Sequence, residues 1–513
     1  MLSRVYTAQL VGLSADLIDV ETDIGKGLHS FSIVGLGDKA VDEARDRINA
    51  AIKNSGFKAP QKGNKKIIVS LAPADVKKEG TSFDLAIALG YLLASGEIKF
   101  EPEKKLFLGE LALDGRVRPI KGVLLLAEKA KRLGMNELYI PAENTAEAAL
   151  VRGLNIYPVT HLQEVIDHLD KRPKEDKRPP VNLEPIAEKS IEHIDALPPI
   201  DFAEVKGQAT AKRGLEIAAA GGHNVAMSGP PGTGKTMLAK AFAGILPNLM
   251  LEEVIEVTGI HSAAGALRDD LIFAPPYRSP HHTASYVSLV GGGTWPKPGE
   301  ITLSHRGVLF LDEFPEFEKR VIEALRQPLE DKVISVARAK SSVNFPANFI
   351  LVAAMNPCPC GYKGHKEREC ICSPSTLGRY ERKLSGPIID RIDVWLNVPQ
   401  INPEKLSSLE EGERSASVRE RVKAARDKQL KRFRTAGLKI KTNSEMTVRD
   451  LRVFAPLTPE LTKILNDAAT RLDLSARAYH RVIKLARTIA DLAGADNIEE
   501  PHLLEALQYR PRK

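Results

Sequence analysis

Short apolar runs predict a parallel sheet in the middle of this 513-residue chain. Residues 225–227, 308–311 and 349–355 are wholly apolar, which is typical of strands buried on both faces. An alanine-rich stretch with helical spacing follows the first run, and polar residues stand directly after the other two. The pattern favours an α/β unit in which helices pack against a parallel sheet.

Further along, the period of the apolar residues changes. Residues 333–338 alternate with a period of two, which predicts a strand of a hairpin. Residues 417–433 and 475–494 carry apolar residues at helical spacing with basic residues between them. The last hundred residues therefore predict a helical bundle.

A change in composition marks the linker between domains. Residues 169–200 are rich in proline and in charges of both signs and have little apolar periodicity, which is typical of a linker. We expect an N-terminal domain at 1–168, a linker at 169–200, a second domain at 201–400 and a helical C-terminal region at 401–513.

A glycine-rich loop between the first strand and its helix is the strongest functional signal. Its spacing, G-x4-G-K-T, is that of a phosphate-binding loop, in which successive backbone N–H groups face the phosphates and the helix N-terminus adds its positive dipole end. Lys235 is expected to reach the β- and γ-phosphates of ATP, and the Thr236 hydroxyl is expected to hold Mg²⁺. The loop consists of Gly229, Pro230, Pro231, Gly232, Thr233, Gly234, Lys235 and Thr236.

Three polar residues follow the other two predicted strands. Asp312 and Glu313 come directly after 308–311, and acids at the carboxyl end of a parallel strand lie beside such a loop. We expect Asp312 to complete the Mg²⁺ shell and Glu313 to orient and polarise the attacking water. Asn356, after 349–355, could position the same water, although it could also be a strand-terminal residue that starts a turn.

Two arginines are candidates for contacts with the γ-phosphate. A guanidinium there stabilises the negative charge spread over the transition state. Arg391 follows a Gly-Pro turn, and Arg477 stands near the start of a basic helical pattern. If either arginine comes from a neighbouring subunit, the chain must assemble with ring-closing symmetry. Each could instead be a surface ion-pair partner, which is the commoner role of a lone arginine.

These motifs together resemble a known family. "GPPGTGKT", "GVLFLDE", "AAMNP" and "SGPIIDRID", with "RSPHHTASYVSLVGGG" and "RQPLEDKVISVARA", closely resemble the magnesium-chelatase-like AAA+ ATPases, and within them the ComM (YifB) group of bacterial proteins. The resemblance covers essentially the whole chain and preserves the order of the motifs. It implies a parallel αβα sheet with a helical lid and a homo-hexameric ring.

The resemblance also implies a function. Proteins of this group are ATP-driven DNA motors that promote branch migration of recombination intermediates, as in natural transformation. By the same likeness Arg391 matches the arginine finger, with Arg382 as a weaker rival, and Arg477 matches a second sensor carried by the lid. A chelatase-type motor that remodels a partner protein inserting Mg²⁺ into a porphyrin remains the alternative, because it shares the ATPase centre.

Two further segments could touch DNA. In related helicases a hairpin before the first sensor projects into the ring pore, so the similarity suggests that Lys332, Arg338 and Lys340 line the pore. The attraction between such residues and backbone phosphates is independent of base sequence, and a solvated hairpin tip is the simpler reading. The adjacent His281 and His282 lie in a loop-rich stretch, and we interpret them as loop or polar-contact residues.

All four cysteines of the chain gather at 358–372 as C-x-C-x9-C-x-C. Clustered cysteines in a long chain favour a metal site over a disulfide framework. Four thiolates suit a closed tetrahedral Zn²⁺ site with a structural role. Reduced free thiols and an iron-sulfur cluster remain open alternatives. The predicted zinc ligands are Cys358, Cys360, Cys370 and Cys372.

The N-terminal domain carries a second likeness. Residues 70–140 are similar to the proteolytic domain of Lon, with Ser82 at the nucleophile position, but Leu126 holds the position of the partner lysine and Lys121 is out of register. Since a serine hydroxyl needs a base, we expect no peptidase activity and interpret Ser82 as a turn or helix-capping residue. The domain is then an α+β, S5-like scaffold that shapes the ring or widens its DNA path.

Charge and composition bear on partners and location. The net charge of +7 and the pI near 9.0 favour a polyanionic partner, although an ordinary basic enzyme fits as well. The chain begins without a signal-peptide pattern, and its longest apolar run is too short to span a bilayer. We therefore expect a cytoplasmic protein that binds no membrane, and the resemblance implies that its polyanionic partner is branched or single-stranded DNA.

Overall fold

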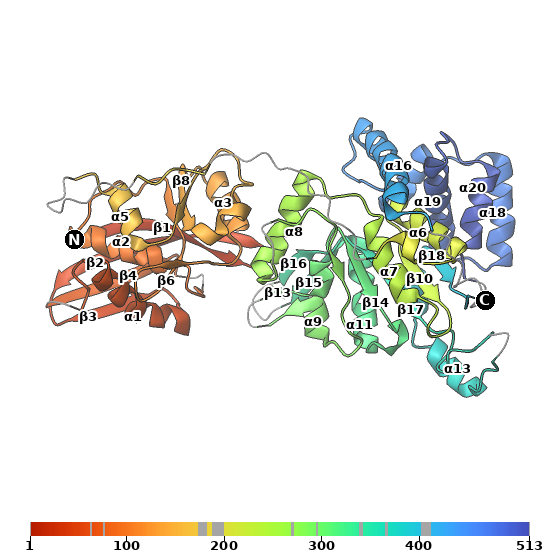
Figure 1. Ribbon diagram of the computed structural model, residues 1–513, viewed down its shortest axis with the longest axis horizontal. Coiled ribbons are helices and arrows are strands. Elements are labelled where there is room, and N and C mark those ends of the chain that lie inside the picture. Colours follow the sequence, from red (N-terminus) through yellow and green to blue (C-terminus); the bar gives the residue numbers. More distant parts are fainter. Residues whose placement is uncertain are drawn as a thin grey trace. The chain divides into compact units, whose positions relative to one another are not determined.

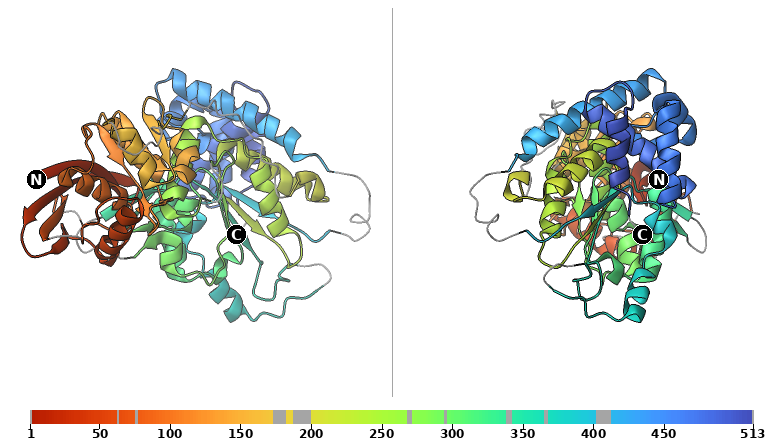
Figure 2. Two further views of the ribbon diagram at one scale, coloured as in Figure 1. Left: turned by 60° about the vertical axis from the view of Figure 1, so that its left-hand side comes forward. Right: turned by 90° about the vertical axis from the view of Figure 1, so that its right-hand side faces the viewer.

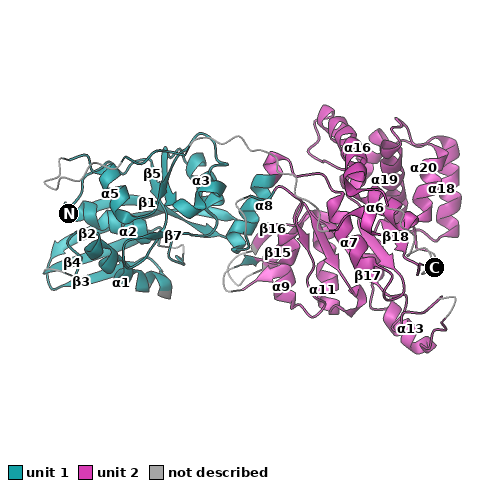
Figure 3. Cartoon of the chain, in the orientation of Figure 1, with its two compact units in different colours: residues 1–193, 254–272, 295–297 teal, residues 194–253, 273–294, 298–513 magenta. Residues whose placement is uncertain are grey.

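The chain divides into two compact units (Figure 3). The first contains residues 1–193, 254–272 and 295–297, and the second contains residues 194–253, 273–294 and 298–513. The domain boundaries expected at 168, 200 and 400 stay predictions. The computed structural model describes residues 2–61, 64–74, 77–172, 182–186, 200–267, 271–293, 296–337, 342–364, 368–401 and 412–511 (Figure 1).

A mixed seven-stranded sheet forms the centre of the first unit, in the order β3-β4-β2-β1-β5-β8-β9. The long strands β1 and β2 are antiparallel, and β5, β8 and β9 run parallel to β1. The strands of this unit are β1 (Leu2–Val11), β2 (Ser14–Lys26), β3 (Ser30–Val34), β4 (Lys65–Ala72), β5 (Lys105–Phe107), β6 (Glu110–Leu111), β7 (Val117–Arg118), β8 (Glu137–Pro141) and β9 (Asn155–Val159).

Two helices of the first unit, α2 and α3, contact the long strands of this sheet, whereas α1 contacts β3 and α5 contacts β9. The apolar run from Leu85 to Leu92 lies in a helix that is buried against β1 and β2. Burial in the protein core therefore accounts for the length of this apolar run. The helices are α1 (Lys39–Asn54), α2 (Asp84–Ser95), α3 (Val123–Arg132), α4 (Thr145–Ala148) and α5 (Leu162–Leu169). This mixed arrangement confirms the α+β class expected for the N-terminal part.

A parallel five-stranded sheet forms the centre of the second unit, in the order β11-β14-β17-β10-β18. The three runs predicted as buried strands are β10 (Val225–Ser228), β14 (Val308–Leu311) and β17 (Ile350–Met355), and β14 and β17 are buried at every position. The remaining strands are β11 (Tyr277–Arg278), β12 (Gly291–Gly292), β13 (Lys297–Pro298), β15 (Val333–Ala337), β16 (Ser342–Pro346) and β18 (Val394–Asn397). The predicted parallel sheet is confirmed.

Helices of the second unit cover the sheet and form the C-terminal region. Helix α6 contacts β18 as well as the C-terminal helices α16 and α19, and the C-terminal helices (blue) stay together in every view of Figures 1 and 2. No helix in the described part of the chain is long and apolar enough to cross a lipid bilayer. The predicted helical C-terminal region is confirmed. The helices are α6 (Ala209–Gly221), α7 (Lys235–Gly244), α9 (Tyr286–Val290), α10 (Glu300–Leu303), α11 (Lys319–Ala324), α12 (Arg326–Asp331), α13 (Pro374–Glu381), α14 (Gly386–Ile389), α16 (Ser415–Thr435), α17 (Val448–Phe454), α18 (Pro459–Arg471), α19 (Ala476–Leu492) and α20 (Glu500–Gln508). Helix α8 (Leu251–Ala264) begins in this unit, and its residues from Val254 onward belong to the first unit.

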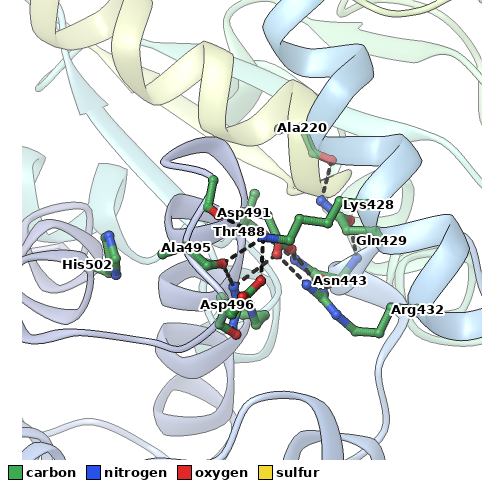
Figure 4. Close-up of polar contacts among 12 residues, drawn as sticks. Ala220, Lys428, Gln429, Arg432, Asn443, Thr488, Asp491, Ala495, Asp496 and His502 are labelled. Carbon is green, nitrogen blue, oxygen red and sulfur yellow. Dashed lines mark hydrogen bonds and ion pairs between the residues drawn. The ribbon is translucent and has the colours of Figure 1, made fainter.

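A buried polar network joins α16 to α19 (Figure 4). Asp491 accepts hydrogen bonds from Arg432, from Arg487 Nη2 at 3.0 Å and from Asn443 Nδ2 at 2.8 Å. The side chains of Asp491 and Arg487 are almost completely buried. Because two cations and one amide converge on it, Asp491 holds the helical region together.

Replacing Asp491 with alanine is expected to lower the free energy of unfolding by about 3–5 kcal/mol, because it leaves buried arginines without their counter-charge. The matched control is Asp496→Ala. Asp496 is also an ion-pair partner in this region, of Lys428, but its side chain is 91% exposed, so its loss should change stability by less than about 0.5 kcal/mol. Chemical denaturation of both variants checks this, and equal losses would contradict it.

Candidate nucleotide site

The glycine-rich loop follows β10, which lies between β17 and β18 in the parallel sheet. Gly232 and Gly234 have φ angles of 76° and 86°, in the left-handed region that favours glycine. A Cβ atom on Gly229 would stand 2.1 Å from the carbonyl oxygen of Val398, so this position also requires glycine. The sequence therefore places its glycines where the loop needs them.

Lys235 begins α7 and its ammonium lies over the loop. Its Nζ donates to the carbonyl oxygens of Gly229 and Pro230 at 2.7 and 2.8 Å and to Asn356 Oδ1 at 3.3 Å. Burial lowers the pKa of Lys235, while Asp312 acts in the opposite direction. The lysine and the asparagine predicted from separate motifs thus meet at one point, across the ends of β10 and β17.

Thr236 and Asp312 also meet. The Thr236 hydroxyl donates to Asp312 Oδ2 at 2.7 Å, as expected of two residues that would share one Mg²⁺. Oxygen donors of this kind suit Mg²⁺, so the residues present fit the ion. Glu313 follows with a φ of 50°, and its side chain is 54% exposed.

His282 makes a contact with Glu313 that the sequence did not predict. Its Nδ1 lies 3.0 Å from Glu313 Oε2. The interpretation of His282 as a polar-contact residue is consistent with this, but its partner is the candidate catalytic carboxylate. The adjacent pair His281 and His282 was a visible signal, although nothing in the sequence identified which group the histidines would face.

Arg391 and Arg477 lie away from the glycine-rich loop of their own chain. Asn224, the residue before β10, donates from its side chain to the Arg391 carbonyl oxygen at 3.1 Å, so Arg391 is at the opposite end of that strand. Four residues of strand span about 13 Å. The two arginines instead converge on one carboxylate: Arg391 Nη2 donates to Glu330 Oε2, and Arg477 Nη2 donates to Glu330 Oε1 at 3.4 Å.

Glu330 is a second functional candidate that sequence reasoning missed. It is the next-to-last residue of α12, three positions before the first residue of the hairpin strand β15, and no separate sequence signal marked it. A cavity of about 600 Å³ lies beside it, and Lys332, Arg477 and Lys484 also line this cavity. Burial lowers the pKa of Lys484 to about 8 and also lowers the pKa of Lys332.

The predicted hairpin is confirmed. β15 pairs antiparallel with β16, from Val333 opposite Pro346 to Ala337 opposite Ser342. Lys332 precedes the hairpin strand and lines the cavity beside Glu330. Its φ of 60° ends α12 and turns the chain before the strand begins. The expectation that Lys332 lines a ring pore stays a prediction. Arg338 and Lys340 lie outside the described residues.

The four cysteines form one cluster. The Sγ atom of Cys358 lies 3.3 Å from that of Cys360 and 3.6 Å from that of Cys370, and the four ligand atoms of the set, which includes Cys372, are all within 4.8 Å of one another. A tetrahedral Zn²⁺ with bonds of about 2.3 Å separates its sulfurs by about 3.8 Å. The cluster could therefore hold a metal ion of that size.

The cysteine segment contacts the nucleotide site on two sides. A Cβ atom on Gly361 would stand 2.6 Å from Cδ of Pro231 in the glycine-rich loop. On α13, which follows the cysteines, Tyr380 donates from its hydroxyl to the Asn356 carbonyl oxygen at 3.0 Å. Burial raises the pKa of Tyr380 to about 12, so the hydroxyl keeps its proton at neutral pH. Movement of this segment would therefore reach both the loop and Asn356.

The first unit lacks a serine–lysine pair at the positions that Lon uses. Ser82 lies in the turn before α2, and the N-cap of that helix is Phe83, so the turn interpretation holds and the capping interpretation is wrong. Leu126 is buried in an apolar cluster on α3 with Val123 and Ala127. A hydrocarbon side chain there cannot accept the serine proton.

Comparison with known families matches nearly the whole chain. Residues 201–406 match "Magnesium chelatase, subunit ChlI", residues 20–144 match "Subunit ChlI of Mg-chelatase", and residues 412–510 match "Magnesium chelatase, subunit ChlI C-terminal".

Individual relatives agree with these matches. The competence protein ComM of Haemophilus influenzae is 43% identical over 519 residues, covering 99% of this chain and 97% of that protein. YifB of Escherichia coli is 42% identical over 513 residues, with the same coverage of both chains. Lon protease of Brevibacillus choshinensis is 28% identical over 173 residues, covering 32% of this chain and 22% of that protein.

Proposed function

Because this chain belongs to the magnesium chelatase family of AAA+ ATPases, in a group with ComM and YifB, we propose that it hydrolyses ATP to drive branch migration of DNA junctions. The observation that supports this most is the meeting of Lys235, Thr236, Asp312 and Asn356 at the ends of three parallel strands. ComM of Haemophilus influenzae, at 43% identity, is named a competence protein.

Each residue of this site has a part in phosphoryl transfer. Lys235 binds the β- and γ-phosphates, and the loop N–H groups orient them. Thr236 and Asp312 would hold Mg²⁺, which would supply positive charge against the negative charge of the phosphates. Glu313 orients the attacking water, and Asn356 holds the ammonium of Lys235 and the water in line.

Arg391 and Arg477 serve a nucleotide bound to the neighbouring subunit. The Arg391 backbone lies at the end of β10 opposite the loop, and both guanidiniums meet on Glu330, which supports a contact with a γ-phosphate across a subunit boundary. Such a contact is heterologous, and repetition of it closes a ring. The homo-hexamer is the assembly that we propose for it.

The DNA strand is gripped by basic residues of the hairpin and of the cysteine segment. Arg338 and Lys340 are proposed at the hairpin tip. A structural Zn²⁺ on the four cysteines fixes the second segment, and α13 beside it contributes to a cavity of about 390 Å³ lined by the cations Lys319, Arg379, Arg382 and Lys383. Phosphate contacts of this kind are independent of base sequence and weaken with salt.

The test is a fluorescent four-way-junction assay with wild-type protein and Glu313→Gln. We expect wild-type protein to move the strands of the junction when ATP is present. The rate of the variant should be about 10²–10³-fold lower, although the variant still binds nucleotide. Junction-independent ATP hydrolysis, with no strand movement by wild-type protein, would instead favour a chelatase-type motor that remodels a protein partner. That alternative is supported by the three matching families, all of which describe subunit ChlI of magnesium chelatase.

A further inference from the structure

A cavity of about 210 Å³ lies in the second unit, outside the nucleotide site. Gly307, directly before β14, and Ile350, the first residue of β17, line it, whereas Asp312 and Asn356 follow the other ends of the same strands. The cavity and the glycine-rich loop are therefore at opposite edges of the parallel sheet. We propose that this cavity binds a small organic molecule with an apolar body and one carboxylate. The inference does not depend on the proposed ATPase activity.

Apolar side chains from three segments form much of the cavity wall. Leu246 and Leu249 come from the segment between α7 and α8, Phe349 from the residues before β17, and Leu430 from α16. A wall of this kind with a few polar groups is typical of small-molecule sites. Because a cavity of about 150 Å³ can hold benzene, the volume here suits a molecule of one or two rings.

Arg426 of α16 supplies a cation without a direct counter-charge. Its Nε donates to the Ala219 carbonyl oxygen at 2.9 Å, and no residue in the described part of the chain accepts a hydrogen bond from its two Nη atoms. Burial lowers the pKa of Arg426, so its surroundings oppose the charge that it carries. A guanidinium in this state can bind a carboxylate through two parallel hydrogen bonds.

Two acidic residues of the cavity are held by other donors. Glu253 Oε1 accepts from Lys441 Nζ at 2.7 Å, and Arg306 Nη1 lies 3.9 Å from the same oxygen. Glu445 accepts from Asn348 Nδ2 at 3.4 Å through Oε1 and from the Lys441 backbone N–H at 3.2 Å through Oε2. Neither carboxylate therefore pairs with the guanidinium of Arg426.

The charges around the cavity set the charge of the ligand. Four cationic and three acidic side chains line it, which leaves an excess of one positive charge. A charge that is partly removed from water without a partner costs free energy. One carboxylate on the ligand would balance this excess, whereas a phosphate with two charges would replace it with a negative one. The charged residues are Arg306, Lys423, Arg426, Lys441, Glu253, Asp427 and Glu445.

The experiment measures binding of 2-naphthoate to the full chain by isothermal titration calorimetry. The comparison probes are 2-naphthamide, which has the same rings without the charge, and 2-naphthyl phosphate. We expect one 2-naphthoate per chain and binding of the amide about tenfold weaker or more, because the amide cannot make a charge-assisted contact with Arg426. The phosphate should also bind more weakly than 2-naphthoate. ATP should not displace the probe, since the glycine-rich loop is at the other edge of the sheet.

Three variants assign the binding to this cavity. Arg426→Met removes the charge and should weaken 2-naphthoate binding about tenfold or more while binding of the amide changes by less than about twofold. Leu430→Trp places a larger side chain in the cavity and should weaken both probes. The matched control is Arg434→Met, because Arg434 is exposed on the same helix and is not among the residues that line the cavity. Its affinity for 2-naphthoate should stay within about twofold of wild type.

Several results would overturn the inference. They are equal affinity for 2-naphthoate and 2-naphthamide, tighter binding of the phosphate, displacement by ATP, unaltered binding in Leu430→Trp, and no measurable binding of 2-naphthoate to wild-type protein. The first and fourth results decide the question even if Arg426→Met fails to fold. Because no readout uses ATP hydrolysis, failure of the proposed function would leave these measurements unaffected.

Discussion

Replacing Arg391 with alanine is expected to lower ATP hydrolysis about 10³-fold or more, because an arginine finger contributes that much to transition-state stabilisation. Arg477→Ala should act in the same direction, since both guanidiniums meet at Glu330. Steady-state ATP hydrolysis at a protein concentration that supports assembly measures both effects. Arg382→Ala is the control, because Arg382 lies on the cavity beside Lys383 and not with this pair.

Mixing two inactive variants tests whether the arginine acts between subunits. Arg391→Ala keeps an intact Glu313, and Glu313→Gln keeps an intact Arg391. In a mixed ring, the intact Arg391 of a Glu313→Gln subunit faces the intact Glu313 site of a neighbouring Arg391→Ala subunit. ATP hydrolysis should therefore return at those subunit boundaries. Failure to recover activity in rings shown to be mixed would contradict the assignment. Loss of activity in Arg382→Ala would transfer the finger role to that residue.

Removal of the metal is expected to unfold the cysteine segment. Structural zinc sites in small domains contribute apparent binding free energies of about 10–16 kcal/mol to folding. The segment at 358–372 contains few buried apolar side chains besides Cys358, so it has little else to hold it. We expect wild-type protein to contain about one Zn²⁺ per chain, and Cys358→Ser with Cys370→Ser to contain almost none.

Metal analysis and hydrogen exchange measure this change. The hydrogen-exchange rate of backbone amides near Cys358 should rise in the double variant or after chelation of the metal. Because Gly361 contacts Pro231, we expect a smaller rise in exchange rate in the glycine-rich loop. Ile371→Ser is the matched control, because Ile371 stands between two cysteines, is 89% exposed and is not a ligand. Undiminished metal content together with unaltered junction unwinding would exclude a structural metal at this cluster.

Much of the fold and of the site follows from local sequence. The three apolar runs became β10, β14 and β17 because a strand buried on both faces has no position for a polar side chain. The carboxyl ends of parallel strands lie at the same edge of the sheet. Lys235, Asp312 and Asn356 follow three such strands and therefore lie close together. The cysteine cluster is equally local, since Cys370 comes only twelve positions after Cys358.

Long-range contacts escaped the same reasoning. His282 was interpreted as a loop or polar-contact residue without a named partner, and its pairing with Glu313 depends on β11 lying next to β14 in the sheet. Lys332 was predicted as part of the hairpin, and a left-handed turn at that residue ends α12 and puts its side chain on a cavity beside Glu330. Arg391 and Arg477 were predicted separately, and the carboxylate that unites them belongs to a third segment.

The sequence by itself determined the strands, the glycine-rich loop, the polar residues at the strand ends and the cysteine set, because each depends on residues that are neighbours in the chain or on the shared edge of parallel strands. Only the tertiary structure decided that His282 faces Glu313 and that Glu330 gathers two arginines a strand length away from their own loop. These contacts depend on strand order and on the packing of helices against the sheet, which no local pattern of residues specifies.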